Sequence, residues 1–247
     1  MRMPRTQFGA AVTPGGRPVV TMAVVAMCAA VWLLQLVEPR VTSEVAFLPI
    51  LGVSEPWRFM TAAFAHSPGS PLHILFNMYA LWQIGQYLEP LLGRVRFAIL
   101  YLVSAFGGSV GYLVLASPPA APLTQAGVDN SNWLNSMVGA SGAVFGLFGA
   151  LLVLNRHLGR SSGPMFGVLA INAVLGFIVP GIAWQAHLGG ALTGVVLAGV
   201  ITLTASQARR RLQLPALAAV TLLLVAAAVA KYAATDDSML RVAVGLA

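Results

Sequence analysis

Apolar runs long enough to cross a bilayer recur along this chain, and they constrain its fold more than any other feature. The longest, 165–203, would extend roughly 58 Å as one helix at about 1.5 Å per residue, which is far more than a single crossing needs. Pro180-Gly181 is the natural break within it. The runs predict seven membrane-spanning helices, at about 19–37, 72–88, 97–116, 135–154, 165–179, 184–203 and 214–230.

The composition agrees with an all-α polytopic membrane protein. Charged residues make up 9% of the 247 residues, whereas an average soluble domain carries roughly 25%. A soluble fold of this size could not cover its surface with so few charges, so an ordinary soluble enzyme is excluded. The only cysteine, Cys28, leaves no partner for an intramolecular disulfide.

The basic residues predict the orientation of the spans. The net charge of +7 could suggest a nucleic-acid partner, but the arginines sit mostly in short gaps between apolar runs, so no nucleic acid is expected. With the N-terminus in the cytoplasm, ten of the 14 basic residues fall inside and seven spans put the C-terminus outside. The ten are Arg2, Arg5, Arg17, Arg94, Arg96, Arg156, Arg160, Arg209, Arg210 and Arg211.

The spans divide the chain into three parts. Residues 1–18 are a polar, flexible cytoplasmic N-terminus, and 19–205 hold six spans. Residues 206–247 contain a basic cytoplasmic loop, the seventh span and a short outer tail. The connection at 38–71 is long and carries several aromatic residues, so it is either a segment lying in the outer interface or an ordinary solvated loop.

Polar side chains inside apolar spans are costly and are therefore candidates for function. Ser141 lies among small residues in the fourth span, next to Gly139, Gly142 and Gly146. Gly142 and Gly146 can form a face for close helix packing, in which case Ser141 is only structural. The same glycines can also leave a serine hydroxyl accessible to a substrate, as a nucleophile needs.

His187 is the only ionisable residue between Arg160 and Arg209. It is either a histidine bonded to a backbone carbonyl or the base for a nucleophile. Gly190 and Gly194 follow it and offer a second small-residue face. If this face packs against that of the fourth span, His187 comes within hydrogen-bond reach of the serine.

His73 and Asn77 are four residues apart in the second span, so they share one helix face near its outer end. Two donors aimed at one point suit an oxyanion site. A metal pair or an interhelical hydrogen bond are the alternatives. A metal would need more ligands than the sequence offers there, and there is no His-Glu-x-x-His pattern and no membrane-embedded carboxylate.

Together these motifs resemble those of the rhomboid family of intramembrane serine proteases, over about residues 19–205. The resemblance is carried by GxSG at 139–142, AHxxGxxxG at 186–194 and HxxxN at 73–77.

Further positions resemble the same family. Trp57-Arg58 is similar to the Trp-Arg pair of its first loop, and residues 89–97 are similar to the turn after its second span. Phe145 stands where the family often has tyrosine, so the ring is kept and the hydroxyl is lost. The seventh span lies beyond the minimal six-helix core, as in members with an added C-terminal helix.

The resemblance implies an intramembrane serine endopeptidase that cuts transmembrane segments of other membrane proteins near their outer ends. Ser141 and His187 would form the catalytic dyad, and His73, Asn77 and the Ser141 backbone N–H would hold the oxyanion. No cofactor and no metal are implied; the partners are the transmembrane substrates and the lipid bilayer, at the inner (plasma) membrane of a cell. The supporting residues would be Phe145, Gly139, Gly142, Gly190, Gly194, Trp57 and Arg58.

Two other functions fit a chain of this class. One is a non-catalytic rhomboid-like protein that binds transmembrane clients; such relatives usually lose the serine or the histidine, and this chain keeps both. The other is a small transporter, which should show inverted repeats or paired broken helices, and the sequence has neither.

Overall fold

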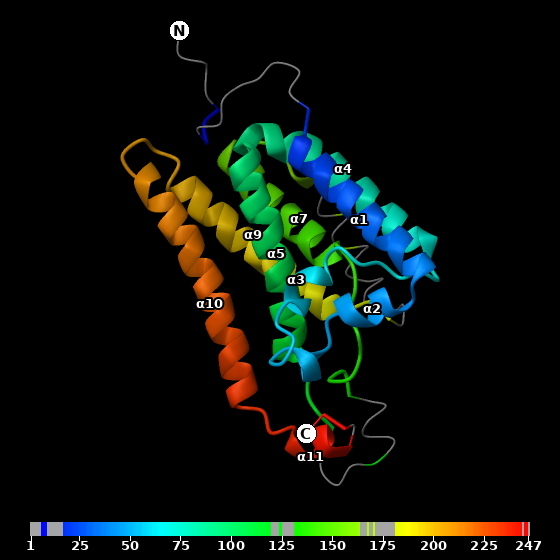
Figure 1. The fold of residues 1–247 in the computed structure, drawn as a ribbon. Coiled ribbons are helices and arrows are strands. Elements are labelled where there is room, and N and C mark those ends of the chain that lie inside the picture. The colour runs from blue at the N-terminus through cyan, green and yellow to red at the C-terminus, as the bar shows by residue number, and fades with distance from the viewer. Residues whose placement is uncertain are drawn as a thin grey trace.

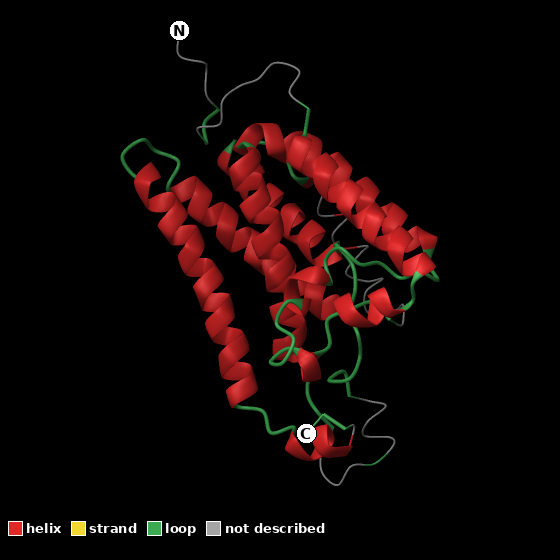
Figure 2. Cartoon of the chain, in the orientation of Figure 1, coloured by secondary structure: helices red, strands yellow, loops and turns green. Residues whose placement is uncertain are grey.

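The computed structural model describes residues 6–8, 17–119, 124, 131–163, 167, 170, 181–243, 245 and 246. Within these residues the regular structure is helical (Figure 2), and the one β-type contact is an isolated antiparallel bridge between Phe47 and Met137. The predicted helical class is therefore confirmed for the part of the chain that the structure describes.

Six long helices and five short ones are present in the described ranges. The long ones are α1 (Val19–Val37), α4 (Pro71–Leu92), α5 (Arg94–Leu115), α7 (Ser141–His157), α9 (Trp184–Leu203) and α10 (Gln213–Ala233). The short ones are α2 (Arg40–Val45), η1 (Pro49–Leu51), α3 (Arg58–Thr61), η2 (Arg210–Leu212) and α11 (Ser238–Ala243).

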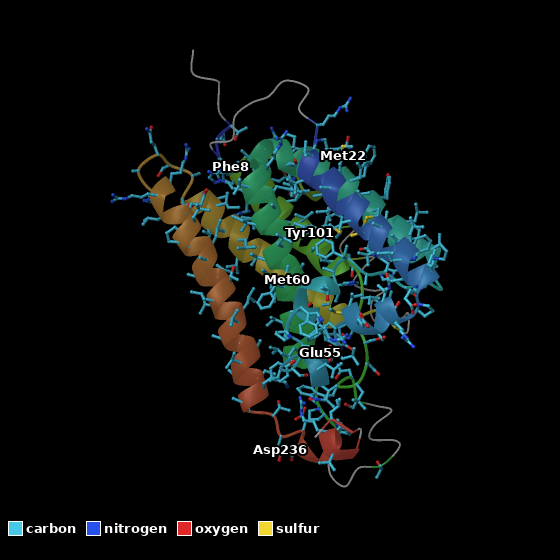
Figure 3. All side chains as sticks on the ribbon, viewed as in Figure 1. Phe8, Met22, Glu55, Met60, Tyr101 and Asp236 are labelled. Carbon is cyan, nitrogen blue, oxygen red and sulfur yellow. The ribbon has the colours of Figure 1, made fainter. Side chains whose placement is uncertain are left out.

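Three helices, α5, α7 and α9, pack against one another in the middle of the bundle (Figure 1). α1 and α4 pair on one side of them, and α10 lies along the other side against α5 and α9. Side chains fill the space between the helices (Figure 3); Tyr101 of α5, for example, is fully buried.

Four described segments are long and apolar enough to cross a membrane: Val19–Val37, Arg94–Leu115, Trp184–Leu203 and Arg210–Ala233. α7 is shorter, with 17 residues, and α4 is less apolar because it carries His73, Asn77 and other polar side chains. The chain is a multi-pass membrane protein. The predicted fifth span, 165–179, lies almost entirely outside the described residues, so the count of seven and the orientation remain predictions.

The predicted start of the fourth span was wrong. The apolar run suggested a helix over 135–154, but α7 begins at Ser141 and continues to His157. Met137 instead pairs with Phe47, and Gly139 has a φ of 133°, a backbone conformation that a helix does not allow. Hydrophobicity alone cannot separate such a buried irregular segment from the helix that follows it.

Glu89 ties α1 to α4. Its carboxylate accepts hydrogen bonds from the backbone N–H groups of Val20 and Thr21, at 2.9 and 2.8 Å, and from the Thr21 hydroxyl at 2.8 Å. The first N–H groups of a helix lack partners within it, so a carboxylate there accepts their hydrogen bonds. Its negative charge is also stabilised by the positive end of the helix dipole.

Arginines gather at the end of the bundle where α4 ends and α5 and α10 begin. There Arg96 Nε donates to Gln213 Oε1 at 2.5 Å, and Arg160 donates to the Tyr87 hydroxyl. Ser141 and the first turn of α9 lie at the opposite end of their helices. The site and the arginine-rich end are thus separated by the length of the bundle.

The connection between α1 and α4 is folded rather than solvated. Phe47, Ile50 and Phe59 are buried, with the Phe47 and Phe59 rings 4.5 Å apart, and α3 packs on α5. This excludes the ordinary solvated loop that the sequence left open. A position in the outer interface remains a prediction.

Glycines set the distance between α7 and α9. A methyl group on Gly190 would lie 1.9 Å from the carbonyl oxygen of Gly142, and one on Gly194 would lie 1.9 Å from that of Gly146. The two backbones therefore touch, as the spacing of these four glycines predicted.

Gly194→Ala tests this contact, and Gly199→Ala on the same helix is the matched control. The first variant forces α7 and α9 apart and should lower stability by about 1–3 kcal/mol, whereas a methyl on Gly199 meets no atom within 4 Å. We expect thermal unfolding in detergent to show a lower midpoint for Gly194→Ala alone. Equal midpoints for the two variants would contradict the close contact.

Candidate active site

A glycine turn presents Ser141 at the start of α7. Gly139 takes a φ of 133°, which side-chain-bearing residues rarely adopt, and its N–H donates to the Ala62 carbonyl at 2.9 Å. Because Ser141 is the first residue of α7, its own N–H has no acceptor within the helix and lies at the positive end of the helix dipole.

His187 lies within hydrogen-bond distance of this serine. Its Nε2 is 2.8 Å from the Ser141 Oγ, although the two residues are 46 positions apart in the sequence. The Nδ1 atom is buried and has no hydrogen-bond partner among the described residues, so no carboxylate there completes a triad. The geometry is that of a serine–histidine pair in which the imidazole is the base hydrogen-bonded to the hydroxyl.

Phe145 holds the His187 ring from the side of α7. The two rings are stacked, with centroids 4.2 Å apart and planes 8° from parallel. Phe145 is one helical turn after Ser141, so the same helix carries the hydroxyl and the surface that fixes the imidazole plane.

His73 lies against the glycine turn. A methyl group on Gly139 would be 2.9 Å from His73 Nε2, and the His73 Nδ1 accepts a long hydrogen bond, 3.4 Å, from the Ser67 N–H. With Nδ1 as the acceptor, Nε2 carries the hydrogen and is a donor beside Gly139. Asn77 is buried one turn further along α4, and its Nδ2 donates to the His73 carbonyl at 2.9 Å, not to the serine.

A family model for the rhomboid domain matches residues 53–204, which is more than half of the chain. The chain belongs to the rhomboid family. Its similar relatives include RHOMBOID-like protein 4 of Arabidopsis thaliana, with 34% identity over 155 residues, and the rhomboid protease GluP of Bacillus subtilis, with 31% over 159. YdcA of the same bacterium is 33% identical over 154 residues.

The aligned region covers most of this rhomboid but only part of the length of each relative. The aligned region is 60% to 62% of this chain, but only 34% of the Arabidopsis protein and 28% of GluP; for YdcA it is 69% of the relative. The chain therefore spans about a third of the length of the first two. The family includes serine proteases, and the serine–histidine pair of this member lies inside the matched region.

Two of the other predicted site residues, Trp57 and Arg58, lie in the first loop of this rhomboid and not at the serine–histidine pair. Trp57 is 53% exposed, and Arg58 is buried in the first loop, where it donates to the Ala46 carbonyl at 2.8 Å and pairs with Glu55. In the part of the chain that the structure describes, neither Trp57 nor Arg58 has a hydrogen bond or ion pair with Ser141 or His187. Their contacts organise the loop that packs beside the site, so any influence on the site is indirect.

His66 is a neighbour of the site that sequence reasoning missed. It is fully buried, its Nε2 accepts a 3.4 Å hydrogen bond from the Ala140 N–H, and its ring is 5.2 Å from that of His73. Its own N–H donates to Gln35 Oε1 at 3.0 Å. The only signal in the sequence is its place seven residues before His73, which does not reveal a contact with the glycine turn.

Space beside Ser141 is small. A cavity of about 10 Å³, enough for about one water molecule, is lined by Ser109, Met137, Gly139 and Ser141, among others. In the described residues no cluster of three or more histidine, cysteine or acidic side chains could hold a metal ion.

The environment of His66 predicts a pH dependence of stability. Burial, followed by the nearby His73, lowers the pKa of His66 to about 4, whereas an unfolded chain would protonate it near the usual 6.5. Between these values the unfolded state binds the extra proton, so the free energy of unfolding should fall by about 1.4 kcal/mol per pH unit on acidification and level off below pH 4.

His66→Gln, which keeps an acceptor for Ala140, should remove this contribution. We expect thermal unfolding measured from pH 7 to pH 4 to show a shallower loss of stability in the variant than in the wild type. Identical slopes would show that His66 is not the buried, neutral group described here.

Proposed function

We propose that this rhomboid is an intramembrane serine endopeptidase that cuts transmembrane segments of other membrane proteins near their outer ends. The observation that carries the proposal is the 2.8 Å approach of His187 Nε2 to Ser141 Oγ. Support also comes from the stacked Phe145 ring and from the membership of the family.

In acylation, His187 Nε2 accepts the hydroxyl proton as Ser141 Oγ bonds to the carbonyl carbon of the scissile peptide. The tetrahedral intermediate then expels the amine, which takes the proton from the imidazolium as the C–N bond breaks. In deacylation, His187 removes a proton from water, and the resulting hydroxide attacks the ester carbon. The imidazolium then returns the proton to Ser141 Oγ as the acyl C–O bond breaks and the second product is released. No third acid is required, because Phe145 orients the imidazole by stacking.

The oxyanion would be stabilised by the start of α7 and by α4. The Ser141 N–H points from the positive end of the α7 dipole, and His73 Nε2–H lies beside the glycine turn. The second N–H of Asn77, free of its bond to the His73 carbonyl, is the third donor. Removing one donor of this kind lowers the rate by about 10²–10³-fold.

The substrate is a transmembrane helix that must unwind at the cut. A helical peptide keeps its carbonyls in i→i−4 hydrogen bonds, where Ser141 cannot reach them. The chain would cross the inner (plasma) membrane seven times, with residues 1–18 inside and residues 19–205 as the six-span core. Residues 206–247 would lead to a C-terminus outside. In this orientation the substrate is cut near its outer end. Ser141 then opens outward.

Proteolysis of a transmembrane reporter in liposomes tests the proposal. Ser141→Ala and His187→Ala should each lower the cleavage rate by roughly 10³-fold or more, because serine and base act as a unit. Ser161→Ala and His157→Ala are matched controls, since both residues are exposed at the other end of α7.

Cleavage by the wild type and both controls, but not by the two site variants, is the expected result. Equal cleavage by Ser141→Ala and the wild type would exclude Ser141 as the nucleophile. If the wild type cleaves no reporter but retains transmembrane segments, the chain binds clients without cutting them.

A further inference from the structure

The chain beyond the region matched by the family model returns to the loops beside the site. α10 runs along the bundle and is followed by α11, close to η1 and to the segment that precedes Ser141 (Figure 1). Tyr232, near the end of α10, donates from its hydroxyl to the Pro49 carbonyl of η1 at 2.8 Å.

Asp237, between α10 and α11, is the centre of this contact. One carboxylate oxygen accepts from Trp133 Nε1 at 2.9 Å, and the other accepts from Arg241 Nε at 2.9 Å. Arg241 also donates from Nη2 to the Ile50 carbonyl at 2.6 Å. The tail therefore binds η1 and Trp133 at once.

Trp133 begins the irregular segment that leads to Ser141. It is fully buried, its ring packs edge-on against Tyr232 at 6.0 Å, and its carbonyl accepts from the Ile50 N–H at 3.2 Å. Four residues later Met137 forms its bridge with Phe47, at 2.8 and 3.0 Å.

Residues 131–140 have no helix or strand of their own, so contacts with other parts of the chain fix their path. Hydrogen bonds with other parts of the chain run along this segment as far as Ala140, and they involve Ser131, Asn132, Trp133, Asn135, Met137, Gly139 and Ala140. Trp133 is the largest fully buried side chain among these residues, and it lies eight residues before Ser141.

We propose that Asp237 is a positioning residue for Ser141, acting through Trp133. This inference rests on the proposed function, since it concerns the rate at which Ser141 reacts. It also gives the seventh predicted span a role, because α10 carries the tail to the end of the bundle where the serine lies.

Asp237→Ala tests the inference against Asp236→Ala, which removes the same charge one residue earlier. Asp236, labelled in Figure 3, is exposed, and its hydrogen bonds among the described residues are to the Ser238 N–H and hydroxyl. With a transmembrane reporter, Asp237→Ala should lower kcat by roughly 3- to 10-fold, the effect of one lost hydrogen bond, with KM within about two-fold of the wild type. Asp236→Ala should match the wild type.

A double-mutant cycle with Trp133→Phe shows whether the two side chains act together. The double variant should be no slower than Trp133→Phe alone, because the bond to Asp237 is already lost. Asp237→Asn keeps an acceptor oxygen for Trp133 and should recover most of the rate. Three results would overturn the inference. Asp237→Ala could cleave at the same rate as Asp236→Ala, or it could raise KM without lowering kcat. In the double variant, the rate losses of the two single variants could multiply.

Hydrogen exchange separates this inference from the proposed function. The amides of Met137 and Gly139 should exchange faster in Asp237→Ala than in Asp236→Ala, whether or not the wild type cleaves a reporter. A wild type without activity would overturn the proposed function. Unchanged exchange at these amides would overturn the positioning role by itself, and it can be measured even if the kinetic variants are poorly active.

Discussion

The backbone contact between α7 and α9 is the interaction on which the candidate site depends. Gly190 and Gly194 lie directly against the carbonyls of Gly142 and Gly146, with no room for even a methyl group. Ser141 and His187 each precede these glycines on their own helix, so the approach of the backbones brings the hydroxyl and the imidazole to 2.8 Å. In a membrane, where apolar side chains gain nothing by leaving lipid for protein, such close packing is a main source of helix association.

The polar groups near this crossing are held by segments that are not helices. The two amides before Ser141 donate to Ala62 and His66, both from the first loop. The N–H of Ser141 itself has no helical acceptor because α7 begins at this residue. Irregular backbone at membrane depth is tolerated when it is buried in protein and its hydrogen bonds are satisfied. The first loop thus shapes the turn, while the helices set the distance between nucleophile and base.

Much of this arrangement was predictable because helices follow simple periods. The apolar run 19–37 matches α1, and the four-residue spacing of the glycines predicted the face on which His187 meets Ser141. The turn before α7 was missed because Met137, Val138 and Ala140 extend the apolar run of the helix on its N-terminal side. His66 was also missed, because nothing in a loop sequence shows which backbone amide its imidazole will meet.

The contact between Asp237 and Trp133 illustrates a second limit of the sequence. These residues are 104 positions apart, in two connections with no periodic pattern, and an aspartate in a tail is usually only a solvated charge. Their bond depends on how α10 returns along the bundle, which is a tertiary property. Sequence reasoning therefore located the chemistry but not the parts that support it from a distance.

Mapping the adduct of a fluorophosphonate probe, which reacts with activated serines, tests the central claim most directly. The wild type in liposomes should carry one adduct, on the peptide containing Ser141, and His187→Ala should carry none. An adduct on another serine, or equal labelling of Ser141 in the two proteins, would contradict a nucleophile activated by His187 across the glycine contact.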